Sequence, residues 1–173
     1  MNRPLRIHEQ TTRLVLLGFA TVVLSVAGVR ADEERRNWYN DPFVQATQGY
    51  PHCPPAQGPL LTREEMREQA HQRVERGTSC WLEGKCEPGG PYLHDQEINE
   101  RVRRVVAGDS RFRRTTLWLT TQAAFVTLEG CVRSRAQQHH LITLIGAQRG
   151  VRYVDDRTTV GLPARRSQSS HHE

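Results

Sequence analysis

Two segments decide the fold of this chain: Phe125-Val-Thr-Leu-Glu-Gly-Cys-Val132 and Gly150-Val-Arg-Tyr-Val154. Apolar and polar residues alternate in the first segment, as expected for a strand with one buried face. A helical pattern lies between the two segments, and the order strand, helix, strand implies a parallel crossover connection. The sequence therefore predicts an α+β fold built around these two strands.

The residues before and between these segments complete a domain over residues 93–162. A first helix is predicted from Asp95 to Gly108, because its apolar residues recur on one helical face. A strand is predicted over 115–120, and a second helix over 134–148. The connection before Phe125 lacks the Gly or Asn-Gly of a two-residue hairpin turn, so a longer loop is expected.

The predicted arrangement is a three-stranded mixed sheet with two helices on one face. Its core is predicted from the apolar faces of the five elements. Ten residues are expected to share it: Ile98, Val102, Leu117, Leu119, Val126, Leu128, Leu141, Leu144, Ile145 and Val154.

The residue pattern of the two strands, together with the order of the elements, resembles the BON domain family. The pattern V-x-L-x-G-x-V lies at 126–132, and G-V-x-x-V lies at 150–154. The resemblance covers about 40 per cent of the chain, its C-terminal part. BON domains are binding modules of the bacterial envelope, named for osmotic-stress and nodulation proteins, and no catalytic set is known for them. The resemblance implies a binding role and leaves the ligand open.

Residues 1–31 have the features of a signal peptide. Arginines precede an apolar run from Leu14 to Val29, and small residues stand three and one positions before a cleavage site after Ala31. The alternative is a retained membrane anchor, but the run has 16 residues, whereas a spanning helix needs about 20. The protein is therefore expected in the periplasm, beginning near Asp32.

The basic character of the chain belongs largely to this segment. Residues 1–31 hold four Arg and one Glu, so the exported chain has a formal net charge of +2, against +5 for the precursor. Nucleic acid is therefore not an expected partner. The 142 residues that remain suit one domain with an extension.

Four cysteines remain after cleavage: Cys53, Cys80, Cys86 and Cys131. An even number in an oxidising compartment predicts two disulfides. Only Cys131 lies inside the BON-like segment, so two bridges require one of them to join the extension to the domain. Which cysteine pairs with Cys131 is left open by the sequence.

Two other roles for the cysteines were weighed. A metal site with His52, His71 or His94 would need closer ligand spacing than Cys80 and Cys86 provide. A redox dithiol usually has two residues between its cysteines. No metal and no cofactor are expected.

The extension, residues 32–92, is predicted to contain one helix over 63–76, begun by the capping box Thr62-Arg-Glu-Glu65 and ended by Gly77. Before this helix, aromatic residues lie among turn-forming Pro, Gly and Asn, which predicts an ordered segment without regular structure. The outer sheet face would carry Trp118, Phe125, Tyr153 and Cys131. The extension is expected to cover this face, because so apolar a surface is costly in water.

Six arginines gather in a short stretch: Arg101, Arg103, Arg104, Arg111, Arg113 and Arg114. Such a cluster can bind the head groups of anionic phospholipids, which agrees with the resemblance. The alternative is a solvated surface that is neutralised by Asp95, Glu97 and Glu100.

No catalytic triad, carboxylate pair, phosphate loop or metal spacing stands out in the sequence, so no enzymatic activity and no small-molecule substrate are expected. The leading hypothesis is a non-enzymatic periplasmic BON-domain protein that binds anionic phospholipid or an envelope protein, in envelope maintenance or osmotic stress. The alternative is a disulfide-stabilised structural or protein-interaction module, and a weaker one is an unrecognised periplasmic enzyme. Residues 163–173 are predicted to be a disordered tail. The sequence does not indicate an oligomeric state.

Overall fold

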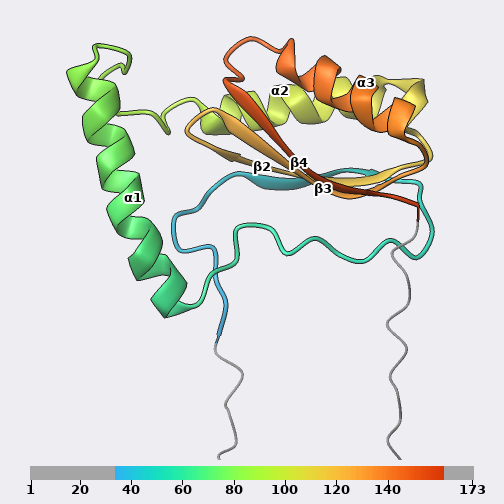
Figure 1. Ribbon diagram of the computed structural model, residues 1–173, viewed down its shortest axis with the longest axis horizontal. Coiled ribbons are helices and arrows are strands. Elements are labelled where there is room, and N and C mark those ends of the chain that lie inside the picture. Colours follow the sequence, from blue (N-terminus) through green and yellow to red (C-terminus); the bar gives the residue numbers. More distant parts are fainter. Residues whose placement is uncertain (1–33, 162–173) are drawn as a thin grey trace, which may run out of the picture. The chain divides into compact units, whose positions relative to one another are not determined.

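The computed structural model describes residues 34–161, so the predicted signal peptide and the predicted tail lie outside the described residues. The elements, in chain order, are β1 (Phe43–Gln48), α1 (Arg63–Leu82), α2 (Asp95–Gly108), the short 3₁₀ helix η1 (Ser110–Phe112), β2 (Thr116–Gln122), β3 (Phe125–Val132), α3 (Arg135–Gly146) and β4 (Tyr153–Val160). The strands form one sheet in the order β1-β2-β3-β4. Helices α2 and α3 cover one face of this sheet, and the chain before α1 runs along the other face (Figure 1). The predicted α+β class is correct.

The prediction of a three-stranded sheet is wrong, because the extension adds a fourth strand. β1 pairs antiparallel with β2, which pairs antiparallel with β3, and β4 runs parallel to β3. Val44 and Ala46 of β1 pack against the core. With three strands, β2 would be an edge with unpaired backbone groups, and β1 satisfies them. Turn-forming residues lie on both sides of this short segment, so its alternation of buried and exposed side chains was not recognised in the sequence.

The hairpin between β2 and β3 also differs from the prediction. Its connection is the two-residue turn Ala123-Ala124, in which both residues have positive φ, 52° and 65°. A left-handed backbone costs a non-glycine residue about 1–2 kcal/mol. The Asp95 carboxylate offsets this cost by accepting hydrogen bonds from both turn N–H groups, each at 2.7 Å. The expected longer loop is therefore wrong.

The core lies between the sheet and the two helices α2 and α3. Eight of the ten predicted core residues are buried, and Leu144 and Val154 pack against them while partly exposed. Phe112 of η1 is fully buried in the same cluster and was not predicted. Its neighbours in sequence are Arg111 and Arg113, so no apolar period marks it.

Helix α1 begins as predicted and ends later. The Thr62 hydroxyl accepts from the Glu65 N–H at 3.2 Å, and the Thr62 N–H donates to the Glu65 carboxylate at 2.8 Å. Gly77 does not end the helix, which continues to Leu82. A glycine inside a helix costs only about 1 kcal/mol, and Gly84 at φ 63° supplies the left-handed residue that ends it.

Two disulfides are present: Cys53–Cys131, with Cα atoms 5.9 Å apart, and Cys80–Cys86, with Cα atoms 5.3 Å apart. The first is the bridge between extension and domain that the distribution of cysteines required. Beside it, the Glu129 carboxylate accepts hydrogen bonds from the backbone N–H groups of Gln57 and Gly58, both at 3.1 Å. These contacts hold the extension against the outer face of β3.

The extension covers the outer face of the sheet only in part. It crosses β3 at Glu129 and Cys131, and the Cys131 side chain is buried. Phe125 lies at the other end of β3 and remains 36% exposed, and its neighbour Tyr153 on β4 remains 59% exposed. The expectation that all the outer aromatic residues are covered is therefore wrong.

Truncation of a core leucine tests the register of β3. Leu128→Ala should lower the free energy of unfolding by about 2–5 kcal/mol, because the Leu128 side chain is fully buried. Leu82→Ala is the control, since Leu82 is 79% exposed and should change the value by less than about 0.5 kcal/mol. Urea denaturation measures both. Equal effects would place Leu128 outside the core.

Removal of the inter-segment disulfide tests the attachment of the extension. Cys53→Ser together with Cys131→Ser should lower the free energy of unfolding by about 2–5 kcal/mol, because the bridge closes a long loop. The matched control is Cys80→Ser with Cys86→Ser. These cysteines are 6 residues apart, against 78 for Cys53 and Cys131. The control should therefore lower the free energy of unfolding by less. Non-reducing peptide mapping checks the connectivity. A free thiol at Cys131 in the oxidised protein would contradict this arrangement.

Candidate functional site

The topology separates two ends of the sheet. At the hairpin end lie the β2–β3 turn, the start of α2 and the connection from α3 to β4. At the opposite end, named the basic end, lie η1 and the connection from β3 to α3. Arg133 Nε donates to the Arg114 carbonyl at 3.2 Å, and Gln137 Nε2 donates to the Arg111 carbonyl at 2.6 Å. These bonds bring two arginine-bearing segments together at the basic end.

The six arginines of the predicted lipid contact do not form one cluster. Arg101 lies at the hairpin end, where it donates to the Glu97 carboxylate and to the Arg149 carbonyl. The guanidinium of Arg103 pairs with Glu100 at 2.6 Å. Arg111 also has a carboxylate partner. Three of the six predicted contact residues are therefore paired with a carboxylate or lie at the other end of the domain.

Arg111 pairs with Asp109 at 2.6 Å. The hydrogen bond from the Arg111 side chain lowers the pKa of Asp109, and the Arg111 backbone N–H adds to this effect. The carboxylate is thus held ionised against the guanidinium, and the positive charge of Arg111 is largely compensated.

The remaining arginines of the set, Arg104, Arg113 and Arg114, are exposed. Within residues 34–161, none of the three has a carboxylate at ion-pair distance. The same holds, over that range, for Arg133 and Arg135 beyond β3. Arg113, Arg114, Arg133 and Arg135 therefore form the uncompensated positive charge of the basic end.

Arg133 also contacts the extension. Its guanidinium carbon lies 4.9 Å from the centre of the Tyr50 ring, in the geometry of a cation–π interaction. Tyr50 is held next to β2 by two hydrogen bonds with the Thr116 hydroxyl, at 2.9 and 3.0 Å. The extension thus helps to position one of the basic side chains, a contact that the sequence did not indicate.

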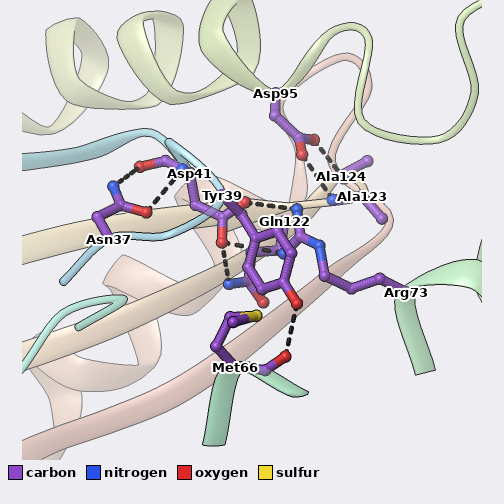
Figure 2. A network of polar contacts seen from close by, with 9 residues as sticks. All are labelled: Asn37, Tyr39, Asp41, Met66, Arg73, Asp95, Gln122, Ala123 and Ala124. Atoms are coloured by element: carbon purple, nitrogen blue, oxygen red, sulfur yellow. Dashed lines mark hydrogen bonds and ion pairs between the residues drawn. The ribbon is translucent and has the colours of Figure 1, made fainter. Parts of the chain in front are cut away.

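At the hairpin end, Asp95 is a buried carboxylate with a structural role. It was considered as a counter-charge to nearby arginines, but its oxygens accept hydrogen bonds from the Ala123 and Ala124 N–H groups (Figure 2). Burial raises the pKa of Asp95, against the opposing effect of these two hydrogen bonds. The negative charge of Asp41 raises it further, and Arg73 lowers it.

A buried ion pair anchors α1 to the same end. Both Arg73 nitrogens donate to the Asp41 carboxylate, at 2.8 and 3.0 Å, and Gln122 donates to it at 2.6 Å (Figure 2). The Arg73 guanidinium carbon lies 4.0 Å from the ring centre of Tyr39 and 4.2 Å from that of Tyr92. Sequence reasoning missed this site, since nothing local distinguishes Arg73 from the other charged residues of α1.

Neither a metal-binding group nor a membrane-spanning helix is found in residues 34–161. All four cysteines are bonded in disulfides. Between residues 34 and 161, no group of three or more His, Cys, Asp or Glu side chains is placed to hold a metal ion. Over the same range, no helix has the length and apolar character needed to cross a membrane.

The segment from α2 to β4 matches a known protein family. Residues 94–161 match the family model of the BON domain. This match confirms the resemblance and places the BON domain in the C-terminal part of the chain, with β1 and α1 outside it. No curated protein was found to match the chain. A BON domain and two disulfides are compatible with an exported envelope protein.

The buried carboxylate generates a prediction about pH. The pKa of Asp95 is raised in the folded state. The stability that this difference contributes is fully present below the pKa of Asp95 in the unfolded chain, about 3.9, and is lost as pH rises through the folded pKa. Asp95→Asn removes this titration. The free energy of unfolding of the wild type, relative to Asp95→Asn, should therefore fall as pH increases above about 4.

Asp109→Asn supplies a control of opposite sign. The pKa of Asp109 is lowered in the folded state. The stability that this difference contributes is present above the pKa of Asp109 in the unfolded chain and is lost as pH falls through the folded pKa. Urea denaturation at a series of pH values compares the three proteins. A difference between wild type and Asp95→Asn that grows with pH would contradict the assigned environment of Asp95.

Proposed function

We propose that this protein is a non-enzymatic periplasmic binding module that attaches to anionic phospholipid through its basic end, in envelope maintenance or stress. The observation that supports this proposal is the difference between the arginines. Arg103 and Arg111 are paired with carboxylates, whereas Arg113 and Arg114 are exposed without such partners in the described residues. Together with Arg133 and Arg135, these two arginines lie at one end of the BON domain.

The expected strength of this contact follows from the number of charges. Each basic residue near an anionic membrane surface contributes about 1 kcal/mol. Four such residues, Arg113, Arg114, Arg133 and Arg135, would give about 4 kcal/mol, which corresponds to about a thousandfold in affinity. The contribution should fall as salt is added, because exposed charges are screened.

The periplasmic location rests on the BON domain, the two disulfides and the proposed signal peptide. Disulfides persist in oxidising compartments, among them the bacterial periplasm. Cleavage after Ala31 would release the extension into that compartment, where Cys53 can be oxidised with Cys131.

A second candidate is a structural or protein-interaction module without lipid binding. It is favoured by the exposed pair Phe125 and Tyr153, whose ring centres lie 5.7 Å apart on the outer face of the sheet. Exposed aromatic side chains are frequent anchors of protein interfaces. An envelope protein would then be the partner.

Vesicle co-sedimentation tests the lipid proposal. The oxidised protein should bind vesicles of phosphatidylglycerol and phosphatidylethanolamine at low salt, release them at high salt, and ignore phosphatidylcholine vesicles. Arg113→Gln with Arg114→Gln should weaken binding by about 30-fold, the loss of about 2 kcal/mol. The control Arg63→Gln with Arg67→Gln removes the same charge from α1 and should leave binding nearly unchanged.

The result also separates the two candidates. Absence of binding to anionic vesicles at low salt would overturn the lipid proposal and leave the protein-interaction module. An equal loss in both double variants would mean that overall charge, and not the basic end, attracts the protein to the vesicles.

A further inference from the structure

The hairpin end contains a cavity of about 340 Å³, a size at the lower end of small-molecule sites. Three parts of the chain form its walls: the loop that follows α1, the beginning of α2, and the connection between α3 and β4. Ile98 and Ala124 give it an apolar lining. The cavity is separate from the basic end, because the two lie at opposite ends of β3.

Positive charge dominates the walls of this cavity. Lys85, Arg101, Arg149 and Arg152 line it, against the two carboxylates of Glu87 and Glu97. Glu97 pairs with Arg101, and Glu87 lies 3.2 Å from the His94 ring. Lys85 pairs with the Glu83 carboxylate at 2.6 Å.

Arg149 and Arg152 carry the remaining positive charge, and that of Arg152 also contributes to the lowered pKa of Glu83. Neither has a carboxylate at ion-pair distance within residues 34–161. Arg101 reaches the same place, because its guanidinium donates to the Arg149 carbonyl. Three guanidinium-bearing residues therefore line one cavity, and two of them have no ion-pair partner within residues 34–161.

A disulfide joins two residues of the cavity wall. Cys80 and Cys86 line it and are joined to each other, and this disulfide holds the loop that carries Lys85. On the opposite side, Gly150 has φ 86°, and a Cβ atom there would lie 3.2 Å from Ile98 Cδ1. The close approach of this backbone to α2 places Arg149 and Arg152 at the cavity.

We propose that this cavity binds a small ligand through a phosphate group. Guanidinium groups donate paired hydrogen bonds to phosphate oxygens, and they remain charged at all physiological pH values. A phosphate monoester carries about −1.5 to −2 charges at pH 7, which suits a site lined by two arginines without an ion-pair partner. The group can belong to a soluble ester or to a lipid head group. This binding is independent of the lipid contact proposed for the basic end.

Titration of the oxidised, full-length exported protein tests the proposal. The probes are glycerol 3-phosphate, as a soluble ester, and dihexanoyl phosphatidic acid below its micelle concentration, as a lipid head group. Glycerol is the uncharged control. Calorimetry should show saturable binding of at least one phosphate probe, and NMR should show shifts of the Ala124 and Gly150 amides. Tighter binding of one probe identifies the source of the phosphate.

Two double variants decide where the phosphate binds. Arg149→Gln with Arg152→Gln should weaken binding at least tenfold, while Arg63→Gln with Arg67→Gln, which removes the same charge from α1, should leave it unchanged. Circular dichroism confirms that both variants fold. No saturable binding of either probe, or an equal loss in the two variants, would overturn the proposal.

The disulfide wall offers a second measurement. Cys80→Ser with Cys86→Ser should weaken probe binding several-fold, because the loop that carries Lys85 is no longer closed. The Cys53–Cys131 bridge remains in this variant, so the extension stays attached. Unchanged affinity in a folded variant would show that the phosphate binds away from this wall, against the proposal.

Discussion

The disulfide between Cys53 and Cys131 fixes the course of the chain before the BON domain. Cys131 lies on the outer face of β3, so the bridge holds the extension against the sheet face that α2 and α3 do not cover. With the extension in place, Glu129 binds two of its backbone N–H groups, and β1 pairs with the free edge of β2. The covalent link reduces the entropy of the unfolded chain, which favours every contact the extension makes.

Buried charge holds the hairpin end together. Asp95 stabilises a turn made of two alanines in left-handed conformations, and the ion pair of Asp41 and Arg73 fixes α1 beside it. A buried ion pair contributes little net stability, because desolvation offsets the attraction. Its value here is specific geometry, since the Arg73 guanidinium must reach one carboxylate between the rings of Tyr39 and Tyr92. Removal of either partner would leave an unpaired buried charge.

The arginines differ in what they can bind, although they are chemically identical. Those that pair with a nearby carboxylate are compensated, as Arg103 and Arg111 are. Those without one remain available, and the fold collects them at two places: the basic end, and the cavity beside Arg149 and Arg152. We propose the first as a contact with the membrane and the second, a partly open cavity, as a site for a phosphate group.

Much of the fold could be predicted from local pattern alone. Alternation and helical periodicity identified the elements of the BON domain and eight buried residues of its core, because each pattern is contained within a few turns or one strand. The capping box at Thr62 was recognisable for the same reason. The distribution of the cysteines required a bridge to Cys131 but left its partner open.

The tertiary structure decided what depends on residues far apart in sequence. The pairing of Cys53 with Cys131 spans 78 residues, and the hydrogen bonds of Asp95 to the hairpin turn span 28 and 29. The Asp41–Arg73 ion pair and the strand β1 are of the same kind. The sequence alone determined the order of helices and strands within the BON domain, most of its core and the number of disulfides. Which turn forms and where a cavity opens were decided only by packing, because each depends on groups that no local period connects.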